Sequence, residues 1–389
     1  MGVLEDSSAR EALFAVQLRY GSQGERSNDG QSKTGESEKQ QQREQALKQK
    51  LKQKQKQKQK QQQKLTRRRE PQILDGFPTR ELEPFRKRWE HLIDLPEDVK
   101  ALEGLSLRAA AIRCLEEANP RRKASLTLTA ARLFRDGLMP LDGETSQAVP
   151  EEPGRDVETV DARAVPKRGG GGSLENRIKM VHALAHIESM AVDLSWDMVA
   201  RFGFGGAQGV DFPREFYEDW VEVADDEARH FLMWESRLHD FDSAYGAMST
   251  HAGLWDSAKE TADLVENRLV VEHMVLEARG LDVAPNTFCK FNDRDDPESA
   301  DMLEAIFTEE ISHVGKGIRW FRFVVTGEVD EIGAVSNAPG HEQQDAACDA
   351  RFKDIVLRKF HGQLKPPFHD VARERAGMPR HWYDPEHAT

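Results

Sequence analysis

Six side chains that can bind metal ions recur in a regular order between residues 181 and 324. The order is a lone Glu, a Glu-x-x-His pair, a second lone Glu and a second pair, namely Glu188, Glu227, His230, Glu277, Glu310 and His313. A four-helix bundle that binds two metal ions takes one Glu from each of two helices and one Glu-x-x-His pair from each of the others. The sequence therefore predicts a di-metal site.

The position of these residues on apolar helix faces is stronger evidence than their number. Thirteen histidines in a Glu-rich chain give about one Glu-x-x-His pair by chance. Both pairs, however, lie on faces that are otherwise apolar, and Glu188 also lies in an apolar stripe, where an unpaired carboxylate is costly to bury. Glu277 shares its face with His273 and is less clear. The spacing from each lone Glu to the following pair repeats, at 39 and 33 residues, which suggests two related helix pairs.

The ligand types indicate which metal the site would take. Carboxylates and imidazoles favour iron or manganese, because structural zinc sites prefer thiolates and imidazoles. We therefore expect two iron ions, with manganese as the alternative. A buried salt-bridge network without metal is the other interpretation, but four converging carboxylates repel one another without a cation. Oxygen activation for substrate oxidation and simple oxidation of iron both remain open.

Other polar residues near the six ligands have roles that the sequence leaves open. His182 and His186 fit hydrogen bonding in the core better than a metal site of their own. His273 is a surface residue, a hydrogen-bonding neighbour of the ligands or an additional ligand. Glu272 lies about 140° from Glu277 around the helix and is not expected to share the site. Residues that could support the ligands or cover the site are Asp193, Asp225, Asp226, Arg279, His251 in the loop 245–255, and His369 in the C-terminal segment PPFHDVAR.

Four long helices are predicted to position the ligands. They cover about 173–202, 213–240, 255–279 and 296–326. Ser173 and Asp296 are expected N-cap residues, and Pro297 occupies the first helical position of the fourth helix. Gly280 is expected to end the third helix as its C-cap.

The rest of the chain divides by composition. The predicted regions are a disordered Lys/Gln-rich tail over 1–70, an N-terminal helical subdomain and strap over 71–172, the bundle over 173–326, and a C-terminal extension over 327–389 that packs on the bundle. Additional helices are expected at 107–118, 122–137 and 346–361. The fold class is therefore all-α, a four-helix bundle with additional helices at both ends.

Charge and cysteine content narrow the possible partners. Eleven Lys or Arg and no acid lie between Lys48 and Arg69, so the net charge of −13 leaves about −24 on the remainder. That disfavours nucleic acid as a partner of the folded part, although the basic tail could contact RNA or an acidic partner. Three widely spaced cysteines fit a reducing compartment such as the cytoplasm, with a nuclear or organellar location left open. No apolar run approaches the roughly 20 residues of a membrane span.

Several motifs resemble those of the DUF455 family. They are CLEEANPRRKASLT, VPKRG, HALAHIESMAVDLSWDMVARF, FYEDWVEVADDEARHF, YGAMSTHAGLW, LEARGLDVAPNT, EEISHVGKGIRWF and LKPPFHDVARERAGMPRHWY, and they cover about 105–384. The resemblance implies a ferritin-like bundle with a di-metal site and the same six residues as ligands. One departure is His369, where the family is expected to have Asn. The family is more remotely similar to the MiaE-type di-iron tRNA hydroxylases.

Three functions are compatible with this sequence. The first is an oxidoreductase whose two irons activate dioxygen to hydroxylate or oxidise an organic substrate, such as a modified tRNA base, with an external electron donor. The second is a protein that oxidises or buffers iron without an organic substrate. The third is an interaction scaffold that the metal stabilises. No sequence pattern predicts the substrate, the electron donor or the oligomeric state.

Overall fold

The computed structural model describes residues 82–141, 147–165, 172–204, 210–329 and 341–384. Contacts divide the chain into two units. One consists of Met1–Phe77 with His361–Gln363, and the predicted disordered tail over 1–70 lies outside the described residues. The other consists of Pro78–Phe360 with Leu364–Thr389 and contains every element named below. The predicted region boundaries stay predictions.

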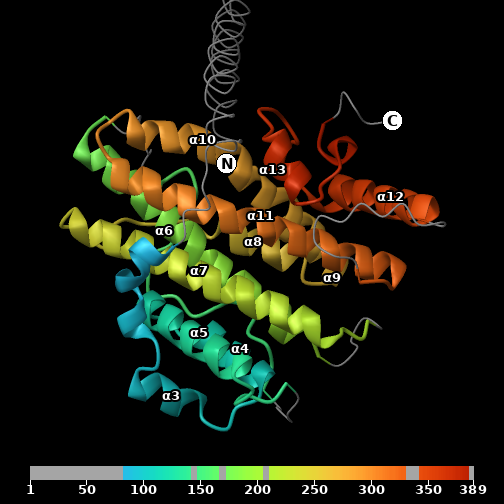
Figure 1. Ribbon diagram of the computed structural model, residues 1–389, viewed down its shortest axis with the longest axis horizontal. Coiled ribbons are helices and arrows are strands. Elements are labelled where there is room, and N and C mark those ends of the chain that lie inside the picture. Colours follow the sequence, from blue (N-terminus) through green and yellow to red (C-terminus); the bar gives the residue numbers. More distant parts are fainter. Residues whose placement is uncertain (1–81, 142–146, 166–171, 205–209, 330–340, 385–389) are drawn as a thin grey trace, which may run out of the picture. The chain divides into compact units, whose positions relative to one another are not determined.

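Four long helical segments form the bundle, as predicted (Figure 1). The first is α6 (Leu174–Asp197), which continues as the π-helix η3 (Met198–Phe202), and it packs along α7 (Arg214–Asp240). The third consists of α9 (Val265–Arg268), the π-helix η4 (Leu269–Leu276) and α10 (Glu277–Asn292). It packs along the fourth, α11 (Pro297–Thr326). The bundle therefore consists of two helix pairs, each carrying one lone Glu and one Glu-x-x-His pair.

Local capping signals set the ends of two of these helices. The side chain of Ser173 accepts a hydrogen bond from the backbone N–H of Asn176, and that of Asp296 accepts one from Ser299. Both predicted N-caps are therefore confirmed. Gly327 ends α11 in the left-handed conformation with φ of 79°, which Gly adopts without a steric penalty.

The predicted bounds of the third helix are wrong. Residues 253–260 form a separate short helix, α8 (Gly253–Glu260), and the ligand-bearing helix begins only at Val265. It also continues through Gly280 and Pro285 to Asn292. Burial explains the continuation, because Leu281 and Phe291 are fully buried beyond the glycine, and Phe291 stacks on Trp234 of α7. Tertiary packing outweighs the weak helix propensities of Gly and Pro here.

Additional helices pack on both sides of the bundle. On the N-terminal side lie η1 (Glu83–Arg88), η2 (Glu90–Leu92), α3 (Pro96–Leu102), α4 (Leu107–Glu116) and α5 (Pro120–Arg135). On the C-terminal side lie α12 (His341–Lys359), α13 (Asp370–Arg375) and η5 (Arg380–Trp382). The helices expected at 107–118, 122–137 and 346–361 are confirmed to within a few residues. Both α5 and α11 contact α7.

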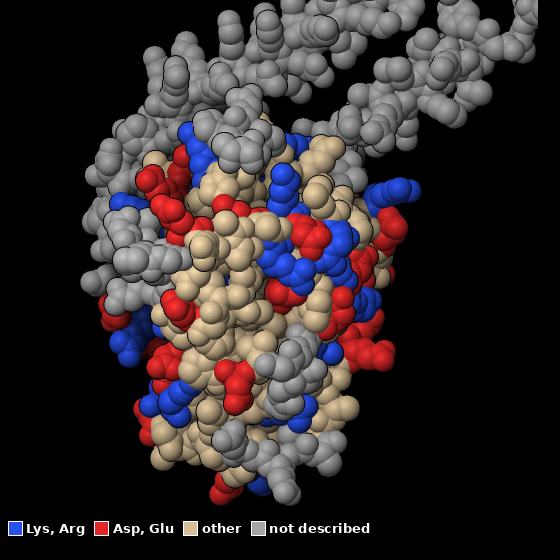
Figure 2. Space-filling model, turned by 90° about the vertical axis from the view of Figure 1, so that its right-hand side faces the viewer, with Lys and Arg blue, Asp and Glu red and all other residues tan. Residues whose placement is uncertain are grey.

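The described residues are all-α, as predicted. The β-pairing among them is an isolated bridge between Thr159 and Thr250. None of the described helices is long and apolar enough to cross a membrane. On the face shown in Figure 2, the described Lys and Arg side chains are interspersed with Asp and Glu. The described part of that face therefore has no extended patch of a single charge.

Candidate metal centre

The bundle brings the predicted ligands together in its interior. They come from α6 (Glu188), α7 (Glu227 and His230), the start of α10 (Glu277) and α11 (Glu310 and His313). Glu227, His230 and His313 are at most 2% exposed, whereas the side chain of Glu310 retains 17% exposure. Helices far apart in sequence therefore build one buried cluster.

Two carboxylates lie between two imidazole rings. Glu227 has one oxygen 3.0 Å from Nδ1 of His313 and the other 3.5 Å from Nδ1 of His230. The oxygens of Glu310 lie 3.3 Å from Nδ1 of His230 and 3.4 Å from Nδ1 of His313. The i, i+3 spacing places each Glu beside the His of its own helix, and the helix packing places it beside the other His. The cluster thus has two positions where a cation would meet an imidazole Nδ1, one beside His230 and one beside His313. Glu227 and Glu310 lie beside both positions.

Glu188 completes the position on the His230 side. One of its oxygens lies 4.0 Å from Nδ1 of His230, and the other accepts a hydrogen bond of 3.2 Å from the indole N–H of Trp234. Glu188, Glu227, His230 and Glu310 each offer one ligand atom, and these atoms all lie within 4.8 Å of one another. Four of the six predicted residues therefore converge on one point.

Glu277 lies near the cluster but is not part of the converging group. Burial, followed by the charges of Glu310 and Glu227, raises its pKa well above the usual value. The charge of His313, which is close to both shared carboxylates, acts on the pKa of Glu277 in the opposite direction. The role of all six residues as ligands stays a prediction.

Two further carboxylates orient the histidines from outside. Glu309 lies 2.7 Å from Nε2 of His230, and Asp226 lies 3.1 Å from Nε2 of His313. With Nε2–H donated to these outer carboxylates, each Nδ1 presents its lone pair to the cluster. Asp226 was among the predicted supporting residues, but Glu309 was missed. The signal was present, because an acid directly precedes the ligand Glu in both DEARH (226–230) and EEISH (309–313).

Arg229 joins the two outer carboxylates. Its guanidinium pairs with Asp226 and lies 3.3 Å from Glu309. Because the two carboxylates bind different histidines, one cation supports both rings. In the motif EEISH, Ser312 occupies the position that Arg229 has in DEARH, so the second motif has no equivalent cation.

The electrostatics of the cluster fit a cation between the rings. Burial opposes the charged form of His230, but the nearby carboxylates of Glu227, Glu309 and Glu310 raise its pKa well above the usual value. Burial and the charges of Glu227 and Glu310 likewise raise the pKa of Glu188. Nδ1 of both histidines and one oxygen of Glu227 lack a hydrogen-bond partner among the described residues. A buried Glu/His cluster of this kind could bind a metal ion.

His182 and His186 do not form a second metal site. Nδ1 of His186 lies 2.8 Å from the hydroxyl of Tyr245, and its Nε2 lies 2.9 Å from the backbone oxygen of His251. Nε2 of His182 accepts a hydrogen bond from the backbone N–H of Gly246. Burial lowers the pKa of both histidines to about 4. These neutral rings attach the loop 245–251 to α6, which agrees with the expected core role.

The remaining acids near the cluster form ion pairs. Asp193 pairs with Lys123 and Arg155, and Asp225 lies 3.0 Å from Arg135. These contacts explain their burial without a metal ion.

His273 and His369, whose roles the sequence left undecided, are both buried. His273 is 2% exposed and packs on Trp220 with ring centroids 4.3 Å apart, so a surface position is excluded. His369 caps α13 by accepting a hydrogen bond from the backbone N–H of Ala372. Arg279, which was among the residues that could support the ligands, lies 3.4 Å from Asp282.

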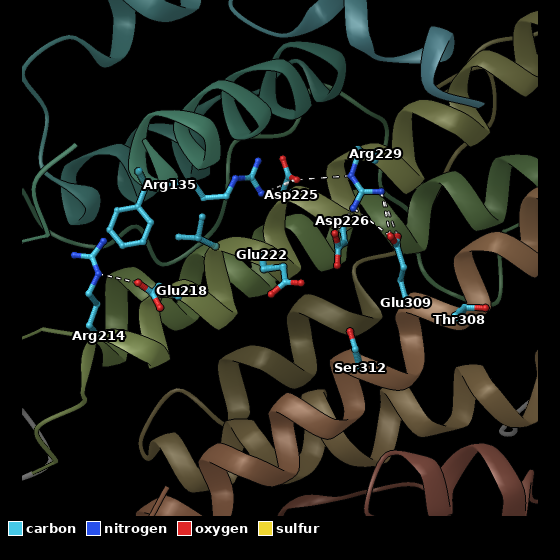
Figure 3. Close-up of a pocket in the computed structure, with 12 residues that line it drawn as sticks. Arg135, Arg214, Glu218, Glu222, Asp225, Asp226, Arg229, Thr308, Glu309 and Ser312 are labelled. Carbon is cyan, nitrogen blue, oxygen red and sulfur yellow. Dashed lines mark hydrogen bonds and ion pairs between the residues drawn. The ribbon is translucent and has the colours of Figure 1, made fainter. Parts of the chain in front are cut away.

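A cavity of about 630 Å³ reaches the outer carboxylates between α5, α7 and α11 (Figure 3). Its lining is mostly charged and includes Asp226, Arg229 and Glu309. Thr308 and Ser312 line the α11 side. The cavity therefore lies on the Nε2 side of the histidines, away from the oxygens that face the cluster.

The fold and the cluster together define an all-α helical protein with a buried Glu/His site. The family described as Protein of unknown function (DUF455) matches residues 116–384, and the chain belongs to that family, as its motifs indicated. An uncharacterized protein of Haemophilus influenzae is 36% identical over 174 residues, which is 45% of this chain and 59% of that protein. No solved structure matches the chain.

Proposed function

We propose that this protein is a ferritin-like di-iron carboxylate protein that activates dioxygen to hydroxylate or oxidise an organic substrate. The observation that supports it most is the placement of Glu227 and Glu310 between the Nδ1 atoms of His230 and His313. Two lone glutamates then supply one further carboxylate for each position. This ligand set is the one that di-iron bundles use.

Charge balance supports two divalent ions at this centre. The four ligand carboxylates carry four negative charges, which two divalent cations neutralise. Without cations, the charges of Glu227 and Glu310 help to raise the pKa of Glu188, so ionised carboxylates repel one another in the buried site. Oxygen-rich ligation with two imidazoles suits iron or manganese.

The bound irons would supply the electrons that reduce dioxygen. The residues of this chain have separable tasks. Glu188, Glu227, His230, Glu277, Glu310 and His313 would hold the metals. Asp226 and Glu309 orient the rings through Nε2, and the helix packing keeps most of the cluster away from water. The electron donor is a separate reductant.

One observation favours an iron-handling protein as a second candidate. Most of the side chains that line the cavity beside the centre are charged, whereas apolar groups usually predominate around an organic substrate. In this alternative, the centre oxidises or buffers iron and releases it.

Anaerobic loading with ferrous iron, followed by exposure to oxygen, tests the proposal. We expect two irons per chain and a near-ultraviolet absorption band that forms with oxygen and then decays. Consumption of oxygen without release of ferric iron would support the oxygenase. Release of ferric iron in proportion to oxygen consumed would favour iron handling. If Glu227→Ala lowers the folding stability and no redox reaction is observed, the third hypothesis, an interaction scaffold that the metal stabilises, would be favoured.

A further inference from the structure

The two sides of the cluster are not equally organised before a metal ion binds. On the His230 side, four ligand atoms already lie within 4.8 Å of one another. On the His313 side, the shared carboxylates are in place, but Glu277 does not belong to the converging group. A site whose ligands are already positioned binds more tightly, because less ordering accompanies binding.

Trp234 holds Glu188 on the more ordered side by a hydrogen bond. It lies four residues after His230 on α7, so it shares the inward face of that helix. Its indole N–H donates a buried hydrogen bond of 3.2 Å to Oε1 of Glu188, while Oε2 faces His230. The indole is fully buried and stacks on Phe291 with ring centroids 6.1 Å apart, so it has little freedom to move.

Among the described residues, no comparable donor holds Glu277 on the other side. Glu277 begins α10 directly after the π-helix η4 and, unlike Glu188, does not belong to the group whose ligand atoms converge. It is also more accessible than Glu188. Glu277 is therefore free to change position when a cation binds beside His313.

We propose that Trp234 positions Glu188 and thereby orders metal binding, so that the position beside Glu188 and His230 takes the first divalent ion. The position beside Glu277 and His313 then takes the second ion more weakly. This inference rests on the proposed function only in requiring that the cluster binds divalent metal. Trp234 is a positioning residue, since it acts through Glu188.

Cobalt titration of the metal-free full-length chain tests the order. Co²⁺ binding is followed by calorimetry and by its visible absorption. The unaltered protein should bind two ions in two resolved steps at least tenfold apart. Trp234→Phe should weaken the first step by about tenfold or more, since it removes a hydrogen bond to a charged acceptor, and leave the second step in place.

Trp196→Phe is the matched control. Trp196 is also fully buried and donates its indole N–H over 2.9 Å, but to Thr127, and it lies eight residues beyond Glu188, about 12 Å along the helix. Both binding steps should be unchanged in this variant. Equal effects of the two substitutions would overturn the role of Trp234.

Two ligand variants keep the test decisive if Trp234→Phe unfolds the protein, which circular dichroism would reveal. Glu277→Gln should remove the second step and retain the first, whereas Glu188→Gln should remove the first. The reverse pattern, or two equal steps in the unaltered protein, overturns the proposed order. Failure of every form to bind Co²⁺ overturns the metal-binding function itself.

Discussion

Arg229 supports both histidines of the cluster through one guanidinium group. It pairs with Asp226, which bonds His313, and with Glu309, which bonds His230. Without the cation, two partly buried carboxylates would repel each other and reorient the rings. The orientation of both histidine rings therefore depends on this side chain.

Replacing Arg229 with Ala is expected to weaken metal binding at both positions by about 10- to 100-fold, the usual effect of losing an outer partner of a ligand. Arg135→Ala is the matched control, because Arg135 lines the same cavity and pairs with Asp225 but with neither outer carboxylate. Isothermal titration with Co²⁺ measures both variants. Equal affinities in Arg229→Ala and Arg135→Ala would contradict the assigned role.

Glu272 gives a pH-dependent stability that is separate from the ligands. Burial raises its pKa from 4.5 to about 7. The pKa of Glu272 is higher in the folded protein than in the unfolded protein. The folding stability that this group contributes is therefore fully present below pH 4.5 and is lost as the pH rises through 7. Glu272→Gln should remove that loss, which is about 3 kcal/mol at most.

Urea unfolding of the metal-free protein between pH 5 and 8 measures this effect. The difference in unfolding free energy between Glu272→Gln and the unaltered protein should increase with pH over that range and then level off. A difference independent of pH would show that Glu272 does not ionise in this window.

At the scale of the elements, α11 and η4 cross closely at Gly317. A Cβ on Gly317 would lie 2.5 Å from the backbone oxygen of His273. Gly317→Ala should therefore destabilise the protein by about 1–3 kcal/mol, because one backbone must move. Gly280 provides the matched control, since a Cβ there meets nothing within 4 Å and the residue is helical.

Gly280→Ala should stabilise the protein by about 0.5–1 kcal/mol, because Ala favours the helix interior over Gly. Thermal unfolding of both variants gives the comparison. Similar changes in melting temperature for the two substitutions would show that helix propensity, rather than the close crossing, determines the result.

These elements show which features the sequence could predict. Caps such as Ser173 and Asp296 are local signals, and the structure confirms both. Gly280 carries the same kind of signal, but the buried residues beyond it decide the outcome, and packing is not a local property. The two Glu-x-x-His pairs were recognisable because the i, i+3 spacing is local as well, and their role as ligands stays a prediction.

The partners of the ligands were harder to predict. Trp234 and Glu309 act across helices, on Glu188 and His230, so their roles depend on how α6, α7 and α11 pack. The acid that precedes each ligand Glu was the available signal for Glu309. No spacing rule connects Trp234 with Glu188, since 46 residues separate them.

At the scale of the whole molecule, metal binding and folding should be coupled. The cluster joins both helix pairs, and ionised carboxylates inside it repel one another without a cation. A cation that binds only the folded state stabilises it by about 2.7 kcal/mol at a free concentration one hundred times Kd. Calorimetric scans of the protein with and without Mn²⁺ should show a higher melting temperature with the metal, and an unchanged value would contradict this coupling.

Anomalous X-ray diffraction from crystals of the iron-loaded protein tests the central claim most directly. Data collected on the two sides of the iron absorption edge locate bound iron independently of any assumed function. We expect two peaks, one beside Nδ1 of His230 and one beside Nδ1 of His313, with Glu227 and Glu310 between them. A single peak, or none, in the cluster of a fully loaded crystal would contradict a di-iron centre.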